Sequence, residues 1–149
     1  RGEKMIITSE QIAYAAGLLD GEGCIHISRH PTRSGERYGL TVMIQMTVSE
    51  PLMFMQDLFG GVLRPAKKPT NKQQWYWGLC SKEAVPLLEQ VLPYLKIKYI
   101  EAAIALLFQE TFKQDYPKSG NSHPVLPENI LAIRKFCCEE CRTEKRFNA

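Results

Sequence analysis

Two acidic residues at the end of a run of small residues are the side chains best suited to metal chemistry. Asp20 and Glu22 close the run 15–23, which reads AAGLLDGEG. Gly21 and Gly23 flank Glu22 and are expected to break a helix there, so that a turn holds the glutamate. A carboxylate held in this way can bind a hard divalent cation through oxygen. The pattern favours a metal site, although a buried helix ending in a glycine cap would share it.

The helix that must present these acids is predicted to span about residues 8–20. Thr8 and Gln11 have the spacing of a capping box, which marks its start. Small residues and one acid then recur at the spacing that shares one helix face: Ala13, Ala16, Gly17 and Asp20. Side chains this small allow a second backbone to approach closely.

After Gly23 the periodicity changes from helical to strand-like, and two hairpins are expected. Their strands are predicted at 24–30 and 38–48, around a loop at 31–37, and at 62–68 and 73–80, around a turn at 69–72. Helices are predicted from 50 to about 58, at about 82–92 and 97–114, and as a C-terminal tail at about 127–144. This order predicts an α+β fold in which a four-stranded antiparallel sheet carries helices on one face.

The run 15–23 resembles the LAGLIDADG motif of homing endonucleases, with Gly21 and Glu22 standing where the motif's name has Ala and Asp. The segment 81–98 resembles the one that follows the last core strand in that family. The resemblance covers about residues 8–110. It implies the αββαββα LAGLIDADG fold, as a single endonuclease domain over residues 1–149.

The resemblance also implies an activity, a cofactor and an assembly. Glu22, with Gly21 beside it, would hold Mg²⁺, and Mn²⁺ or Ca²⁺ could occupy the same site. Lys98 matches a lysine placed near the scissile phosphate, with Lys96 as its nearby competitor. Because the chain has one motif, a second chain must supply the second acid, which implies an intron-encoded homodimer that cuts double-stranded DNA at a long pseudo-palindromic site. The motif helices would then meet through Ala13, Ala16, Gly17 and Asp20, although capping the helix end is the favoured role of Asp20.

The outer face of the sheet and the hairpin loops supply the expected DNA contacts, since strand side chains can read base edges and loop lysines more often hold phosphates. The candidates are His26, Ser28, His30, Arg33, Arg37, Gln45, Arg64, Lys67, Lys68, Lys72, Gln74 and Tyr76. A polar outer face is also what any half-exposed antiparallel sheet shows. The motif and the basic loops together favour DNA.

Two departures from the family pattern keep other functions open. Val48 stands where family members often have Gln or Asn, and valine cannot order water. Glu22 replaces Asp and adds a methylene, which shifts metal geometry. The alternatives are an RNA maturase that assists intron splicing, for which Glu22 would be dispensable, and a sequence-specific DNA-binding protein that does not cleave.

Composition is consistent with a soluble intracellular protein that has no membrane or small-molecule partner. The 149 residues carry a formal charge of +3 and a pI near 8.6, which permits nucleic-acid binding without requiring it. No signal peptide or membrane-length apolar run is evident. Cys137, Cys138 and Cys141 form a CCxxC cluster, but no second pair lies at zinc-site spacing, so reduced thiols on a helix face are expected instead.

Overall fold

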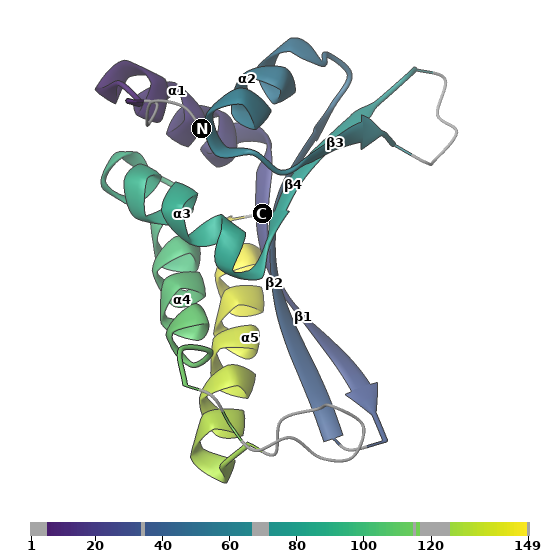
Figure 1. The fold of residues 1–149 in the computed structure, drawn as a ribbon, viewed down its shortest axis with the longest axis vertical. Coiled ribbons are helices and arrows are strands. Elements are labelled where there is room, and N and C mark those ends of the chain that lie inside the picture. Colours follow the sequence, from purple (N-terminus) through teal and green to yellow (C-terminus); the bar gives the residue numbers. More distant parts are fainter. Residues whose placement is uncertain (1–5, 34, 67–71, 115, 117–125, 149) are drawn as a thin grey trace.

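The chain folds into a four-stranded antiparallel sheet with helices packed on one of its faces, as predicted (Figure 1). The computed structural model describes residues 6–33, 35–66, 72–114, 116 and 126–148, and the side chains of these except 146–148. The strand order is β1-β2-β4-β3, so each hairpin contributes one edge strand and one central strand. Among the described residues, no helix combines the length and apolar character needed to span a membrane.

The elements follow one another in the predicted order. Their bounds are α1 Ser9–Glu22, β1 Gly23–Thr32, β2 Gly35–Met46, α2 Glu50–Phe59, β3 Val62–Pro65, β4 Trp75–Cys80, the 3₁₀ turn η1 Ser81–Ala84, α3 Val85–Val91, the 3₁₀ turn η2 Leu92–Tyr94, α4 Tyr99–Glu110 and α5 Glu128–Asn148. The capping box is present, because the Thr8 side chain accepts the Gln11 N–H and the Gln11 side chain accepts the Thr8 N–H.

Several element ends differ from the sequence-based prediction. The first hairpin is longer, since pairing continues to Thr32 and Gly35 and replaces most of the expected loop at 31–37. Contacts of Glu36 explain the extension: its carboxylate pairs with Arg29 and accepts a hydrogen bond from Tyr38 at 2.7 Å. The second hairpin is shorter than expected in its described part, because β3 ends at Pro65.

The core lies between the sheet and the helices. Strand alternation sends Ile25, Ile27, Leu40, Val42, Ile44, Trp77 and Leu79 inward, where each is at most 2% exposed. The Trp77 indole N–H donates to the carbonyl of Gly60 at 2.8 Å. Gly60 and Gly61 both have positive φ, and a Cβ on Gly61 would lie 2.5 Å from the Gly78 carbonyl oxygen. Glycine is therefore required where α2 turns into β3.

Helix α5 lies beside α4 on the helical side of the sheet (Figure 1), and two of its thiols contact the outer backbone edge of β1. The Cys138 thiol donates to the Ile27 carbonyl at 3.2 Å, and the Cys141 thiol donates to the Ile25 carbonyl at 3.5 Å. Burial raises the pKa of both thiols, that of Cys141 to about 11. The CCxxC cluster therefore packs as reduced thiols on a helix face, and two of them bind strand-edge carbonyls that would otherwise lack a partner.

Candidate active site and nucleic-acid interface

Glu22 is the last residue of α1 and its side chain is exposed. The expectation that Gly21 and Gly23 break the helix around Glu22 is wrong, because α1 continues through Gly21 and β1 begins at Gly23. Gly23 permits this direct passage: a Cβ there would lie 2.3 Å from Leu19 Cδ1. The carboxylate of Glu22 makes no hydrogen bond or ion pair with any described residue, and so remains available to a ligand.

Asp20 joins the end of α1 to the segment that precedes α4. Its carboxylate accepts three backbone N–H groups, from Lys96 at 2.7 Å, Ile97 at 3.2 Å and Lys98 at 3.0 Å. Three charge-assisted bonds from consecutive residues fix this segment against the motif helix. Both carboxylate oxygens are thus used within the chain, where they fix residues 96–98 to α1 and do not cap the end of α1 itself. The assignment of Asp20 to a dimer interface stays a prediction.

Lys98 contacts the same helix end with its side chain as well as with its backbone. It is the N-cap residue of α4, and its ammonium group donates to the backbone carbonyl of Asp20. Lys96 shares the Asp20 contact only through its backbone and has an exposed side chain. The structure therefore brings Lys98, rather than Lys96, to the helix end that carries Glu22.

One face of α1 is open to solvent and lined by small residues. Ala13, Gly17 and Gly21 are exposed, and a Cβ placed on Gly17 or Gly21 would meet nothing within 4 Å. Ala16, predicted to share this face, is 1% exposed and packs in the core of its own chain instead. The error follows from the three-residue step, which rotates Ala16 toward the buried side that also carries Leu19.

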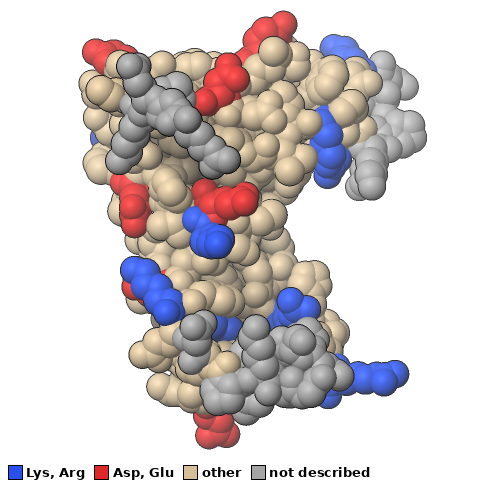
Figure 2. Space-filling view, viewed as in Figure 1, with Lys and Arg blue, Asp and Glu red and all other residues tan. Residues whose placement is uncertain are grey.

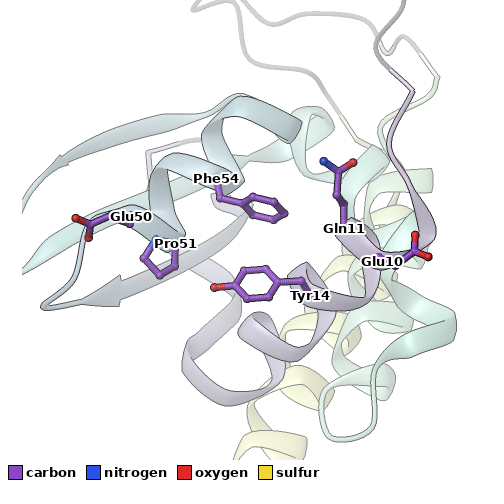
Figure 3. A pocket seen from close by; sticks show the side chains of 6 residues that line it. All are labelled: Glu10, Gln11, Tyr14, Glu50, Pro51 and Phe54. Carbon is purple, nitrogen blue, oxygen red and sulfur yellow. The ribbon is translucent and has the colours of Figure 1, made fainter.

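The open face of α1 borders an apolar groove between α1 and α2 (Figure 3). The groove has a volume of about 420 Å³ and is lined by Glu10, Gln11, Tyr14, Glu50, Pro51 and Phe54. The rings of Tyr14 and Phe54 meet edge to face, with centroids 5.0 Å apart. Tyr14 is 48% exposed, so an apolar surface continues from the small residues of α1 onto α2.

The outer sheet face is the hollowed side of the molecule, with basic side chains toward both ends of the hollow (Figure 2). Register places His26, Thr41 and Cys80 in one cross-strand row and Gln45, Tyr76 and Arg64 in another. The side chains of Gln45 and Gln74 hydrogen-bond to each other, and the Arg64 guanidinium lies 4.3 Å from the centre of the Tyr76 ring. Polar groups from all four strands thus share one concave face.

The remaining DNA-contact candidates have different surroundings. Ser28 donates its hydroxyl to the Gly39 carbonyl at 3.2 Å, so part of its hydrogen-bonding capacity is used within the sheet. His30, Arg33, Arg37 and Lys72 are exposed. Lys67 and Lys68 lie outside the described residues. Val48, just beyond β2, is 50% exposed.

Sequence reasoning missed a basic group contributed by α5. Burial lowers the pKa of His26, and the positive charges of Lys145, Arg142 and His30 lower it further. Arg142 and Lys145 follow Cys141 on the helix whose thiols contact the β1 edge, which brings their charges near a β1 side chain more than a hundred residues away in sequence. The one available signal was the placement of these basic residues at helical spacing after the cysteines.

The described residues of one chain contain no group of three or more His, Cys, Asp or Glu side chains that could hold a metal ion. The donors at the end of α1 are the Glu22 carboxylate and nearby backbone carbonyls, which are oxygen ligands of the kind that Mg²⁺ and Ca²⁺ prefer. The donors are of the type that such a metal site needs. The described part of one chain supplies too few of them to complete it.

Comparison with solved structures identifies the fold. The homing endonuclease I-CvuI, solved with its DNA target in the presence of Ca²⁺, matches with a TM-score of 0.72 and 17% identity over 91% of this chain and 82% of its own. The archaeal intron-encoded homing endonuclease I-Vdi141I, complexed with DNA, matches with a TM-score of 0.74 and 15% identity over 91% and 84%. I-SmaMI, bound to uncleaved DNA with calcium, matches with a TM-score of 0.66 and 14% identity over 93% of this chain.

The chain therefore has the LAGLIDADG homing endonuclease fold. It corresponds to most of the I-CvuI and I-Vdi141I chains but to only 46% of the I-SmaMI chain. No protein-family sequence model matches it, and no curated protein sequence does. The likeness thus lies in three-dimensional structure.

Proposed function

We propose that this protein is a LAGLIDADG homing endonuclease that cleaves double-stranded DNA at a specific site as a homodimer. The observation that carries the proposal is that the exposed Glu22 and the Lys98 ammonium, which donates to the Asp20 backbone carbonyl, both lie at the end of α1. A carboxylate and a cation at one helix end, beside a concave polar sheet, are suited to phosphodiester hydrolysis. Solved proteins of the same fold are homing endonucleases complexed with DNA.

The proposed assembly completes the metal site. Two chains that meet through the open faces of α1 would bring Glu22 of one chain toward the partner's Glu22, and the Gly21 carbonyl oxygens would lie beside them. The small side chains at Ala13, Gly17 and Gly21 favour close approach of the two backbones. A two-fold axis at this point would present two copies of the sheet to the two halves of a pseudo-palindromic site.

The proposed chemistry divides the work between metal and protein. Mg²⁺ bound by Glu22 would supply Lewis acidity at the scissile phosphate and lower the pKa of a coordinated water. The Lys98 ammonium, held at the Asp20 carbonyl, offsets negative charge that develops on the phosphate. The outer sheet face orients the duplex so that the bond to be cut lies over the end of α1. A DNA substrate would place the protein in an intracellular compartment.

A paired cleavage and binding assay tests the proposal. A target is first selected from a random duplex library by binding in Ca²⁺, cloned into a plasmid and incubated with Mg²⁺. Wild type should make a double-strand break, whereas Glu22→Gln should bind equally well and not cut, because the amide keeps the side-chain shape and loses the anionic oxygen. Glu89→Gln, on the exposed side of α3, is the matched control and should cut normally.

The assay also separates the alternatives. Cutting by Glu22→Gln at the wild-type rate would overturn the catalytic assignment. A wild-type protein that selects a DNA consensus but never cuts it would instead be the non-cleaving DNA-binding protein, in agreement with Val48 at the position where a polar side chain was expected. A protein that selects no DNA sequence would instead support the RNA maturase alternative.

A further inference from the structure

Tyr76, on the outer face of β4, lies flat along its own strand. Its hydroxyl would be 2.4 Å from a Cβ built on Gly78, the next residue on the same face, and two ring carbons would be 2.9 and 3.1 Å from it. Glycine at position 78 therefore leaves the space that the tyrosine ring occupies, and Gly78 itself is buried. Burial of the phenol also raises the pKa of Tyr76.

Arg64 rests on this ring from the neighbouring edge strand. Arg64 and Tyr76 are direct cross-strand partners, and the guanidinium carbon lies 4.3 Å from the ring centre. A guanidinium stacked on an aromatic ring at this distance is attracted to its face and loses much of its rotational freedom. The three residues are thus stacked: Gly78 leaves space for the Tyr76 ring, and the Arg64 guanidinium packs on that ring.

The hydrogen-bond donors of Arg64 remain largely unused. One long bond, 3.4 Å from Nη1 to the Pro65 carbonyl, is its only hydrogen bond within the described part of the chain. The ion pairs there join Arg29 to Glu36 and Lys113 to Glu110, so no described carboxylate neutralises Arg64. An arginine has five N–H donors in a fixed plane, and most of those of Arg64 stay free for a ligand.

The position of Arg64 favours a base edge over a phosphate as that ligand. Arg64 lies within a strand, in one row with Tyr76 and Gln45, rather than at the tip of a hairpin. The paired amides of Gln45 and Gln74, groups that suit base edges, lie on the same face. The arginine guanidinium is rigid and planar and can present two parallel N–H donors. These match the O6 and N7 acceptors of guanine in the major groove.

We propose that Arg64, held on the Tyr76 ring above Gly78, reads a guanine in each half of the DNA target. The inference rests on the proposed DNA-binding function and extends it to one base. Tyr76 and Gly78 are positioning residues in this arrangement, because they act on the DNA only through the guanidinium. The contact is to the base, so it selects sequence rather than anchoring the backbone.

The test begins with the wild-type consensus selected in Ca²⁺ from a random duplex library. We expect one guanine per half-site whose replacement by another base weakens binding by between about 5-fold and 150-fold. Replacing that guanine with 7-deazaguanine, which lacks only the N7 acceptor, should weaken wild-type binding. It should leave Arg64→Ala binding unchanged, because that variant has no donor for N7.

The positioning roles need variants that keep the protein folded. Tyr76→Phe keeps the ring and should preserve the guanine preference, whereas Tyr76→Ser should relax it. Gly78→Ala should also relax it, because the added Cβ displaces the ring. Arg64→Lys retains the positive charge but lacks the planar guanidinium. It should therefore retain affinity for DNA and lose the preference for guanine. Circular dichroism and thermal melting establish that each variant is folded.

Salt dependence distinguishes a base contact from a phosphate contact. Arg33→Ala, at the tip of the first hairpin, should reduce the slope of log affinity against log salt by about one unit per protomer, as expected for a lost phosphate contact. Arg64→Ala should change that slope much less. An Arg64→Ala protein with unchanged base preferences and a slope reduced by a full unit would overturn the inference. A wild-type protein that selects no consensus would overturn the proposed function as well.

Discussion

Asp20 and Lys98 hold each other through opposite parts of their structures: the Asp20 carboxylate accepts the Lys98 backbone N–H at 3.0 Å, and the Lys98 ammonium donates to the Asp20 backbone carbonyl. A residue of the motif helix and the N-cap residue of α4 are therefore fixed together. Because Asp20 lies two residues before Glu22, this reciprocal contact sets where the lysine charge lies relative to the candidate metal ligand.

Replacing Asp20 with asparagine should destabilise the fold. The amide has one acceptor oxygen in place of two anionic ones, so at least one of three backbone N–H groups loses its partner, at a cost of about 1–3 kcal/mol. Chemical denaturation measures the change in the free energy of unfolding. Asp57→Asn, at an exposed position on α2, is the control and should be nearly neutral. Equal stabilities of the two variants would contradict the anchoring role of Asp20.

Replacing Lys98 with alanine should slow DNA cleavage on the order of 100-fold while leaving DNA affinity nearly unchanged, because its charge acts on the developing transition state. Cleavage rates in Mg²⁺ and dissociation constants in Ca²⁺ separate the two effects. Lys96→Ala removes a lysine two residues away whose side chain is exposed, and it should cut at close to the wild-type rate. A reversed result would exchange the roles of the two lysines.

Replacing Gly17 with leucine should prevent dimerisation without unfolding the chain. A Cβ at Gly17 meets nothing within 4 Å in the protomer, so the protomer itself accommodates the larger side chain. Any loss of assembly would then arise from the partner's surface. Light scattering measures the mass, and Ala103→Leu, an exposed helical position on α4, is the matched control. An intact Gly17→Leu dimer would exclude α1 as the interface.

Acidification should destabilise the protein through His26. Burial and the charges of Lys145, Arg142 and His30 lower the pKa of His26 in the folded chain below its ordinary value of about 6.5. The unfolded chain therefore binds the proton more readily, and the free energy of unfolding falls as pH drops through this value. Denaturation of wild type and His26→Gln between about pH 7.5 and pH 5 measures this, and the variant should show the weaker pH dependence.

The thiols should react with alkylating reagents in the order of their exposure. Cys80 is exposed and should react first, while Cys137, Cys138 and Cys141 are at most 1% exposed and should react only after unfolding. Burial raises the pKa of these three thiols, which further reduces the reactive thiolate. Mass spectrometry of briefly treated native protein identifies the modified sites. Rapid labelling of Cys138 or Cys141 would show that α5 does not stay on the β1 edge.

Local patterns predicted the elements well because they reflect periodicities that each segment carries by itself. The capping box at Thr8, the alternation around Ile25 and Ile27, and the glycine stop after α2 are of this kind. Long-range relationships were not predictable in the same way. The Asp20 bonds to residues 96–98 and the α5 thiol bonds to β1 join segments more than seventy residues apart, and no local spacing encodes them.

The candidate site was also predicted only in part. Glu22 and Lys98 were found from short motifs, and the structure brings both to the end of α1. Ala16 was assigned to the wrong side of its helix because small residues occur on both the buried and the open face. Composition alone cannot separate those two uses of alanine.

The alternation of the sheet separates two structural roles along the same strands. Inward residues such as Ile44 and Trp77 pack in the core and maintain the fold, whereas their outward neighbours such as Gln45 and Tyr76 do not pack in the core. Under the proposed function, substitutions on the outer face would therefore change the preferred DNA sequence at little cost in stability. Gly78 is the exception, because any side chain at this position would take the space that the Tyr76 ring occupies. Under the proposed function, a change of DNA target would therefore be harder to achieve through position 78 than through its outward neighbours.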